Sequence, residues 1–317
     1  MKRRSFIQLG VAGSAALQLS PLLALDNSKI RYEMPKRKFG KTGEMVSIVG
    51  FGGIMLRNNG QEFANRLVSE AFDAGINYFD VAPGYGDAQE LLGPALQSYR
   101  KKSFLACKTN KRMKDGAEKE LHDSLKKLKT DHFDLYQLHA MSKQEDIDQV
   151  FGPGGTIELF EKARKDGKVK HLGFSAHNEE VALKAMDLFD FDTILYPFNC
   201  VCWHNGNFGP KVFETARRKN MGISALKAVA KRRVPENEKR SYDNMWYLPF
   251  EQEKDIENSL RFTLSKDLAS TVHAGDVKFF SKTIEFVRSQ QEIAAPDENE
   301  VKTMIAGIEP IFKHPVG

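Results

Sequence analysis

Eight short apolar segments, most of them followed by a stretch with helical periodicity, constrain the fold of this chain more than any other feature of its sequence. A helix between two strands returns the chain to the same end of the sheet, so that neighbouring strands run parallel. Two of the predicted helices, Asn65–Ala74 and Glu179–Leu188, each show one apolar face. The predicted strands are Val46–Phe51, Asn77–Val81, Ser103–Cys107, Phe133–Leu138, Val169–Phe174, Thr193–Tyr196, Gly222–Leu226 and Ser270–His273.

The length of the chain agrees with a single α/β domain built from these units. Eight strand–helix units over about 250 residues are the size of a (β/α)8 TIM barrel, and the chain has 317 residues. A doubly wound open sheet is the alternative, and it requires a Gly-x-Gly-x-x-Gly turn after the first strand. Gly50-Phe51-Gly52-Gly53 does not match that turn, so the barrel is favoured. Two additions are predicted: a polar surface insertion at Lys231–Asn244 and a closing amphipathic helix at Glu298–Phe312.

The first 25 residues differ in character from the rest. Lys2-Arg3-Arg4-Ser5-Phe6-Ile7 precedes a mildly apolar stretch that ends at Leu25, and adjacent arginines in this setting resemble a bacterial twin-arginine export signal. The pattern predicts an export signal at residues 1–25, the twin-arginine (Tat) machinery as a partner, and a periplasmic location. A weak cleavage site leaves an uncleaved anchor open, and a plain amphipathic helix is the structural alternative.

Charge and cysteine content exclude several classes of protein. The formal net charge is +5, but three of the basic residues lie in the first 25 positions, so the remainder is nearly neutral and does not indicate a nucleic-acid-binding protein. Three cysteines are too few for a disulfide framework. The eight histidines show no metal-ligand spacing, so no metal site is predicted.

Four polar residues stand at or after the ends of consecutive predicted strands. Asp80 and Tyr85 follow the second strand, Lys108 the third and His139 the fourth. Because the carboxyl ends of barrel strands meet at one rim, we expect these side chains to share a site.

The chemistry of these four side chains is mutually consistent. A phenol titrates near ~10, and an adjacent ammonium such as Lys108 favours the phenolate and lowers that value. A carboxylate holds the ammonium in place, and a histidine hydrogen-bonds a carbonyl oxygen that gains charge on reduction. With no metal site predicted, the electrons are expected from an organic cofactor.

These residues also carry a family resemblance. Asp80–Gly86, Cys107–Thr109 and Leu138–His139 resemble the three signature segments of the aldo-keto reductases, and Arg37–Gly43 with Gly50–Gly53 resembles their N-terminal hairpin and first strand. The resemblance implies a barrel over residues 36–317 with a short N-terminal hairpin. It also implies NADPH as cofactor and aldehydes or ketones as small-molecule substrates. By that likeness Tyr85 is the general acid, Lys108 and Asp80 tune it, and His139 orients the carbonyl.

The same likeness assigns cofactor contacts. Ser175 matches the serine that bonds the nicotinamide carboxamide, whereas Ala176 and Leu195 replace the amides usually found nearby. The other implied contacts are Leu226 and Lys227 beside the nicotinamide, and Gly275 and Lys278 in the segment that usually binds the 2′-phosphate. An acidic residue, Asp276, stands within that segment, so NAD remains an alternative to NADP.

Two classes of function follow. The favoured one is a reductase that transfers hydride from a nicotinamide cofactor to a carbonyl. The alternative is a non-catalytic nicotinamide-nucleotide-binding module. His177, Trp203 and Trp246 either line a substrate opening or only cover the barrel end. Nothing in the sequence indicates an oligomeric state.

Overall fold

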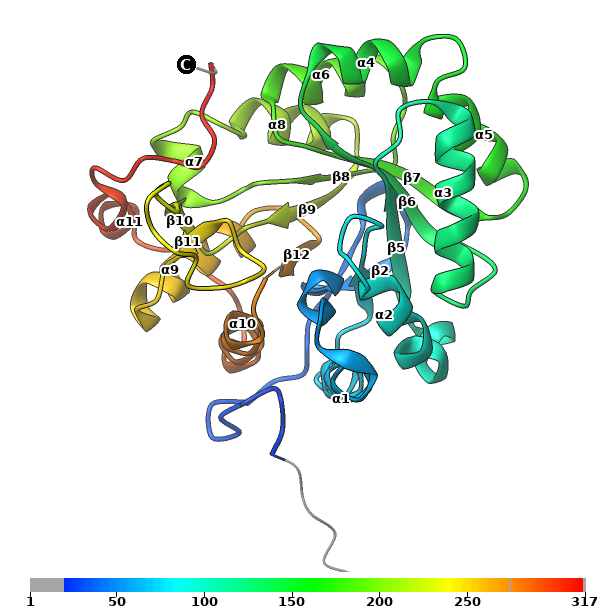
Figure 1. The fold of residues 1–317 in the computed structure, drawn as a ribbon. Helices are drawn as coiled ribbons and strands as arrows, with labels where there is room; N and C mark the ends of the chain where they lie inside the picture. The colour runs from blue at the N-terminus through cyan, green and yellow to red at the C-terminus, as the bar shows by residue number, and fades with distance from the viewer. Residues whose placement is uncertain (1–19, 274, 316–317) are drawn as a thin grey trace, which may run out of the picture.

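The computed structural model describes residues 20–273 and 275–315 and has a closed barrel of eight parallel strands surrounded by helices (Figure 1). The last strand pairs with both the first and the seventh, which closes the barrel. The predicted (β/α)8 TIM barrel is therefore confirmed, and every predicted strand overlaps an observed one. The barrel strands are β3 (Val49–Gly52), β4 (Tyr78–Asp80), β5 (Phe104–Thr109), β6 (Phe133–Met141), β7 (Val169–Ala176), β8 (Thr193–Tyr196), β9 (Gly222–Leu226) and β12 (Ser270–His273).

An antiparallel hairpin precedes the barrel, as the resemblance implies. It pairs β1 (Lys36–Lys38) with β2 (Met45–Ser47). The predicted first strand, Val46–Phe51, is wrong in one respect, because a bend at Ile48 divides it between β2 and β3. The Ser47 hydroxyl donates to the Val49 carbonyl oxygen at 2.7 Å, and this local hydrogen bond accompanies the change of direction.

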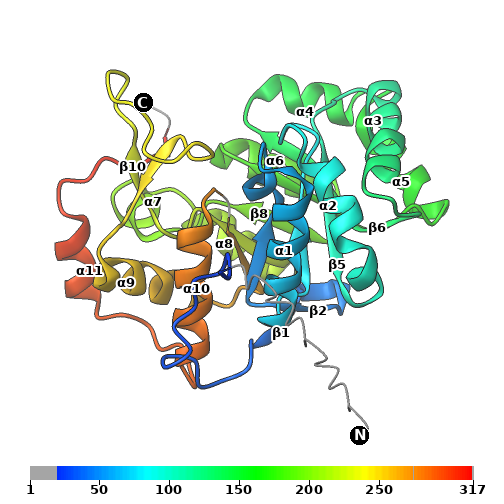
Figure 2. The same ribbon diagram turned by 60° about the horizontal axis from the view of Figure 1, so that its bottom comes forward.

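Helices form a layer around the barrel (Figures 1 and 2). On α1, the residues that the sequence places on one face, Leu67, Val68 and Ala71, are all buried. The helices are α1 (Gly60–Asp73), α2 (Ala88–Leu96), α3 (Lys114–Lys127), α4 (Gln144–Phe151), α5 (Thr156–Lys165), α6 (Glu179–Leu188), α7 (Cys200–His204), α8 (Pro210–Arg218), α9 (Glu253–Leu264), α10 (Val277–Ser289) and α11 (Glu298–Ile305).

The closing helix is shorter than predicted. α11 ends at Ile305, and the predicted extension to Phe312 is wrong. Gly307 takes a left-handed φ of 70°, and Pro310 lacks the N–H that a helix needs, so the chain leaves the helical path. The segment that follows is irregular, and it buries Ile311 and packs Phe312 against the mouth of the barrel.

The predicted insertion after the seventh barrel strand is only partly a loop. It begins within β10 (Ala230–Arg233), which pairs antiparallel with β11 (Tyr247–Pro249). Figure 2 shows this hairpin beside the C-terminal segment, and Arg233 donates a hydrogen bond to the Ile311 carbonyl oxygen at 3.1 Å.

The predicted export signal lies outside the described residues as far as residue 19, and it stays a prediction. Its described part contacts the barrel, because the backbone N–H groups of Leu22 and Leu23 donate to the Glu70 carboxylate of α1 at 3.1 and 2.7 Å. Among the residues with a described position, no helix is both long and apolar enough to cross a membrane.

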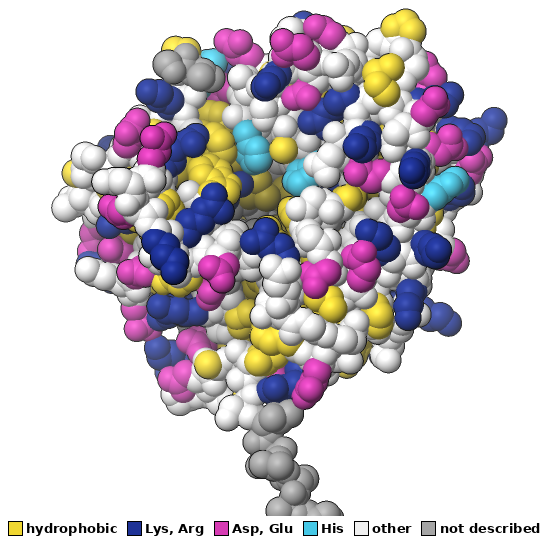
Figure 3. Space-filling model, in the orientation of Figure 1, with side chains coloured by type: hydrophobic (Ala, Val, Ile, Leu, Met, Phe, Trp, Pro, Cys, Tyr) yellow, Lys and Arg dark blue, Asp and Glu magenta, His cyan; other side chains and the backbone are white. Residues whose placement is uncertain are grey.

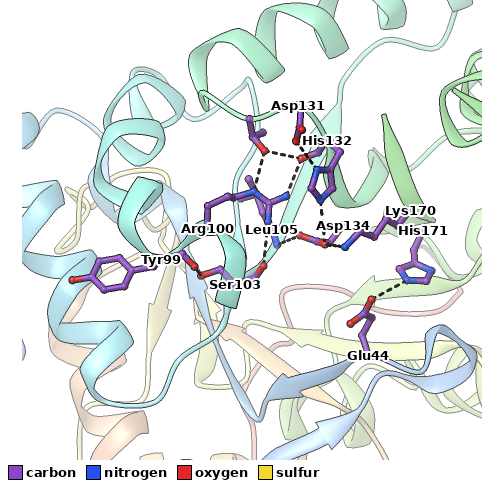
Figure 4. Close-up of polar contacts among 11 residues, drawn as sticks. Glu44, Tyr99, Arg100, Ser103, Leu105, Asp131, His132, Asp134, Lys170 and His171 are labelled. Carbon is purple, nitrogen blue, oxygen red and sulfur yellow. Dashed lines mark hydrogen bonds and ion pairs between the residues drawn. The ribbon is translucent and has the colours of Figure 1, made fainter. Parts of the chain in front are cut away.

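A buried carboxylate ties three strands together at the amino end of the barrel (Figure 4). One oxygen of Asp134 accepts hydrogen bonds from Arg100 at 2.8 Å and from the Leu105 amide at 2.9 Å, and the other accepts from Lys170 at 2.7 Å. Burial alone would raise the pKa of Asp134, but these three donors outweigh it and hold the pKa below its ordinary value. Asp134 therefore contributes stability as an anion that joins β5, β6 and β7.

We expect Asp134→Ala to lower the free energy of unfolding by about 3 kcal/mol at pH 7, because it leaves the Arg100 guanidinium without its buried partner. Since the folded-state pKa is depressed, the difference from the wild type is present above about pH 3.9 and shrinks as the pH falls through the folded-state pKa. Urea denaturation at several pH values measures both effects. Asp131→Ala is the control, since that side chain is 94% exposed, and equal stability of the two variants would contradict the account.

Candidate active site

The structure brings the four predicted catalytic residues together at the carboxyl ends of the strands. Asp80 ends β4, Lys108 lies near the end of β5, and His139 lies near the end of β6, while Tyr85 is in the loop between β4 and α2. The Lys108 ammonium forms an ion pair with Asp80, and both side chains are almost completely buried. Residues from three neighbouring strands therefore share one site, as their position in the sequence predicts.

A further residue, Gln137, belongs to this cluster and was missed in the sequence. Its side-chain amide donates to the second oxygen of Asp80 at 3.1 Å. Gln137 lies two positions before His139 on β6, and alternate residues of a strand point to the same side. That two-residue spacing is the signal by which Gln137 could have been found in the sequence.

Tyr85 lies near both the Lys108 ammonium and the His139 imidazole. The Lys108 nitrogen is 5.3 Å from the centre of the Tyr85 ring, and it is near enough to the hydroxyl to favour the phenolate. The ring centres of Tyr85 and His139 are 5.7 Å apart, and the planes are nearly perpendicular. The phenol therefore has a cation and a neutral hydrogen-bonding group as neighbours.

Burial decides the ionisation of Tyr85. It raises the pKa of the phenol, and although Lys108 lowers it as expected, the combined effect of burial and Asp80 leaves the pKa above its ordinary value. The argument from the sequence weighs only the Lys108 ammonium, so it predicts a lowered pKa for Tyr85, whereas the net change in the structure is upward. At neutral pH, Tyr85 is a protonated phenol with a hydrogen to donate.

His139 is neutral as well. Burial, followed by the positive charges of Lys108, Lys227 and Arg112, lowers the pKa of His139 to about 3. Its Nδ1 atom is buried and has no hydrogen-bond partner within the described part of the chain. A neutral imidazole carries one N–H, which it can donate to a carbonyl oxygen without placing a second positive charge beside Lys108.

The residues predicted to contact the nicotinamide lie at the same rim. Ser175 is buried at the end of β7, and its hydroxyl accepts from the Ala140 amide at 2.8 Å, next to His139. Leu226 ends β9 and is partly buried, and Lys227 follows it with a left-handed φ of 57°. These positions agree with the predicted contacts, which stay predictions.

Gly275 and Lys278, the residues predicted to bind the 2′-phosphate, lie among hydrophobic side chains and beside an acid. Gly275 has a φ of 128°, and a side chain there would meet Met245. The Asp276 carboxylate caps α10 by accepting from the Lys278 amide at 2.8 Å. The Lys278 ammonium lies 5.4 Å from the centre of the Phe279 ring. The contacts described for Gly275 and Lys278 are thus with hydrophobic or aromatic side chains and a neighbouring acid.

A cleft of about 570 Å³ opens beside the rim. Its lining includes His177, Trp246 and Phe312, and the rings of His177 and Phe312 stack with their centres 5.0 Å apart. A hollow of this kind, lined by hydrophobic side chains and bordered by histidine and by lysine or arginine, is visible in Figure 3. His177 and Trp246 thus lie at an opening, whereas Trp203 packs under Lys266, whose nitrogen lies 4.1 Å from the centre of the Trp203 ring.

The architecture and the clustered side chains agree with a comparison to known families. Residues 48–304 match the model of the aldo/keto reductase family. The chain belongs to the aldo/keto reductase family. Members of this family are oxidoreductases that use nicotinamide cofactors, generally NADP(H), on small-molecule carbonyl substrates.

Similar proteins have been found by sequence and by structure. The chain is 32% identical over 180 residues to the uncharacterized oxidoreductase YqkF of Bacillus subtilis, and the aligned part covers 52% of this chain and 56% of YqkF. It is 30% identical over 196 residues to a 6-dehydroglucose reductase of Novosphingobium aromaticivorans, covering 54% and 62% of the two chains. The chain thus spans less than two thirds of the length of these relatives.

Solved structures support the fold. An aldo-keto reductase from Bacillus halodurans in its holo form has a TM-score of 0.66 at 23% identity, covering 89% of this chain and 99% of its own. A putative aldo-keto reductase from Pseudomonas aeruginosa has a TM-score of 0.67 at 22% identity, covering 83% of this chain and 98% of its own.

For residues 20–273 and 275–315, no group of three or more His, Cys, Asp or Glu side chains is arranged to hold a metal ion.

We expect His139 to remain an uncharged imidazole down to about pH 4, because its pKa is about 3. Nuclear magnetic resonance of protein with isotope-labelled histidine measures this directly, and His139→Gln identifies the signal by its loss. An imidazole signal from His139 that titrates between pH 6 and 7 would contradict the burial argument.

Proposed function

We propose that this aldo/keto reductase reduces an aldehyde or ketone with hydride from a nicotinamide cofactor, and that Tyr85 is the general acid. The observation that carries the proposal is the buried Lys108–Asp80 pair next to a protonated Tyr85. A module that only binds nucleotide has no need of this arrangement, so it supports the reductase over the non-catalytic alternative.

Each side chain has a definite role in this proposal. Tyr85 donates a hydrogen bond to the carbonyl oxygen and transfers its proton as that oxygen gains charge. The Lys108 ammonium, held by Asp80, stabilises the phenolate that remains. The neutral His139 donates a second hydrogen bond to the same oxygen and orients the substrate.

The residues at the rim fit the nicotinamide end of the cofactor. When bound, the cofactor supplies the hydride. The Ser175 hydroxyl makes only a long donor contact of 3.5 Å to the Leu138 carbonyl oxygen, so its hydrogen is able to turn to a carboxamide oxygen. We propose that Ser175 holds the carboxamide and that Leu226 lies beside the ring.

The segment after β12 does not fit a 2′-phosphate. The Asp276 carboxylate already occupies the positive end of α10, which is where an anion binds best. A phosphate at that point would meet a like charge, and Met245 packs closely against Gly275. We therefore propose that NADH binds at least as tightly as NADPH, which favours the NAD alternative.

Tyr85→Phe tests the proposed acid. We expect kcat/KM for a panel of aldehydes to fall by at least about 100-fold, because the variant loses the transferable proton. Nicotinamide fluorescence measures cofactor binding, which we expect to change by no more than about twofold, since the aromatic ring is retained.

Tyr99→Phe is the matched control for this variant. The Tyr99 hydroxyl bonds to Ser69 at 2.9 Å, away from the rim, and we expect the control to keep full activity. Undiminished aldehyde reduction by Tyr85→Phe would overturn the assignment of the acid.

Asp276→Ser tests the phosphate argument. Serine keeps an oxygen that caps α10 but removes the charge, so we expect NADPH to bind about fivefold more tightly while NADH changes little. Fluorescence titration with both cofactors measures the ratio. A wild type that strongly prefers NADPH, with a preference that the substitution leaves unchanged, would show that the phosphate binds elsewhere.

A further inference from the structure

Positive charge is in excess around His139. Lys108, Lys227 and Arg112 all act on its pKa. Lys108 is paired with Asp80, and the Arg112 Nε atom is paired with Asp146 at 2.7 Å. Among the residues that the structure describes, the Lys227 ammonium has no acidic partner within ion-pair distance.

Lys227 packs against three of the residues that line the cleft, His177, Trp246 and Phe312, rather than extending into solvent. Its nitrogen lies 3.3 Å from His177 Nε2 and 5.8 Å from the ring centres of both Trp246 and Phe312. His177 brings no negative charge, and its own pKa is lowered by burial and by Lys227. Burial lowers the pKa of Lys227 to about 8, so the amine is still largely protonated at neutral pH. A desolvated cation without a counter-ion is unfavourable, and a bound anion would relieve that cost.

Arg112 provides a second, independent observation. Its Nη2 atom donates to the His139 carbonyl oxygen at 2.8 Å, so Asp146 and this oxygen hold the guanidinium in place. Its Nη1 atom is buried and has no hydrogen-bond partner among the residues with a described position. A fixed arginine donor without an acceptor is costly in the protein alone and is suited to a carboxylate oxygen.

Resting on the proposed function, we propose that the carbonyl substrate carries a carboxylate on an apolar body, and that Lys227 and Arg112 bind this carboxylate near His139. The apolar body follows from Trp246 and Phe312, whose rings line the cleft and lie next to the Lys227 ammonium. Aromatic or aliphatic aldehydo and keto acids have this chemistry. Their carbonyl end reaches Tyr85 while the carboxylate remains at the cations.

Binding without turnover tests this proposal separately from the reductase. The chain has two tryptophans, so Trp203→Phe leaves Trp246 as the sole indole reporter beside Lys227. In this background we expect sodium benzoate to change the fluorescence saturably and to bind at least about tenfold more tightly than the neutral benzamide. Because no cofactor or reaction is needed, this result does not depend on whether hydride is transferred.

Lys227→Met identifies the binding group. We expect it to weaken benzoate binding at least about tenfold, to leave benzamide unchanged, and to retain the fold by circular dichroism, while Lys227→Arg restores benzoate binding. Lys266→Met is the matched control, because Lys266 is also a partly buried lysine packed on an aromatic ring, that of Phe262 at 4.2 Å, but away from the cleft. It should leave benzoate binding unchanged.

Matched substrates then extend the test to turnover. We expect Lys227→Met to raise the KM for 4-carboxybenzaldehyde at least about tenfold more than it raises the KM for 4-methylbenzaldehyde, because any loss of a cofactor contact affects both substrates alike. Equal binding of benzoate and benzamide by the wild type would overturn the proposal. It would also be overturned if Lys227→Met weakened nicotinamide-cofactor binding and left benzoate binding intact, because the anion would then be a cofactor phosphate.

Discussion

The buried ion pair between Lys108 and Asp80 is the interaction on which the candidate site depends. Either charge alone at this depth would be strongly destabilised, so the pair is maintained only if β4 and β5 keep their register and Gln137 on β6 satisfies the second oxygen of Asp80. The closed barrel supplies that register. Burial in the barrel also keeps Tyr85 and His139 uncharged beside the Lys108 ammonium, because it raises the pKa of the phenol and lowers that of the imidazole.

The same rim combines two kinds of surface, a polar group of four side chains and a cleft with aromatic walls. Beside that cleft lies Lys227, a lysine without an acidic partner among the described residues. Phe312 connects them, because the segment after α11 carries its ring onto His177 and next to Lys227. The hairpin of β10 and β11 contributes Trp246 to the same cleft. Two additions to the common barrel thus shape the opening, and they account for an environment that the barrel strands alone would not provide.

The barrel and the catalytic group were predictable because they depend on local signals: apolar strands at regular spacing and polar residues at the strand ends. Features that are set by contacts between distant segments of the chain were not predictable from the sequence. The length of α11 was overestimated, although Gly307 and Pro310 mark its end, because the apolar spacing continues to Ile311. The packing of Met245 against Gly275 and the raised pKa of Tyr85 both depend on burial, which only the folded chain reveals.

Tracing the hydride tests the central claim most directly. The purified protein is supplied with NADH that carries deuterium at both C4 positions, together with an aldehyde, and the alcohol product is analysed by mass spectrometry. The account predicts that deuterium appears on the carbinol carbon, and that Lys108→Met, which leaves Asp80 unpaired, forms little or no labelled alcohol. Alcohol without deuterium, or labelled alcohol formed equally well by Lys108→Met, would contradict it.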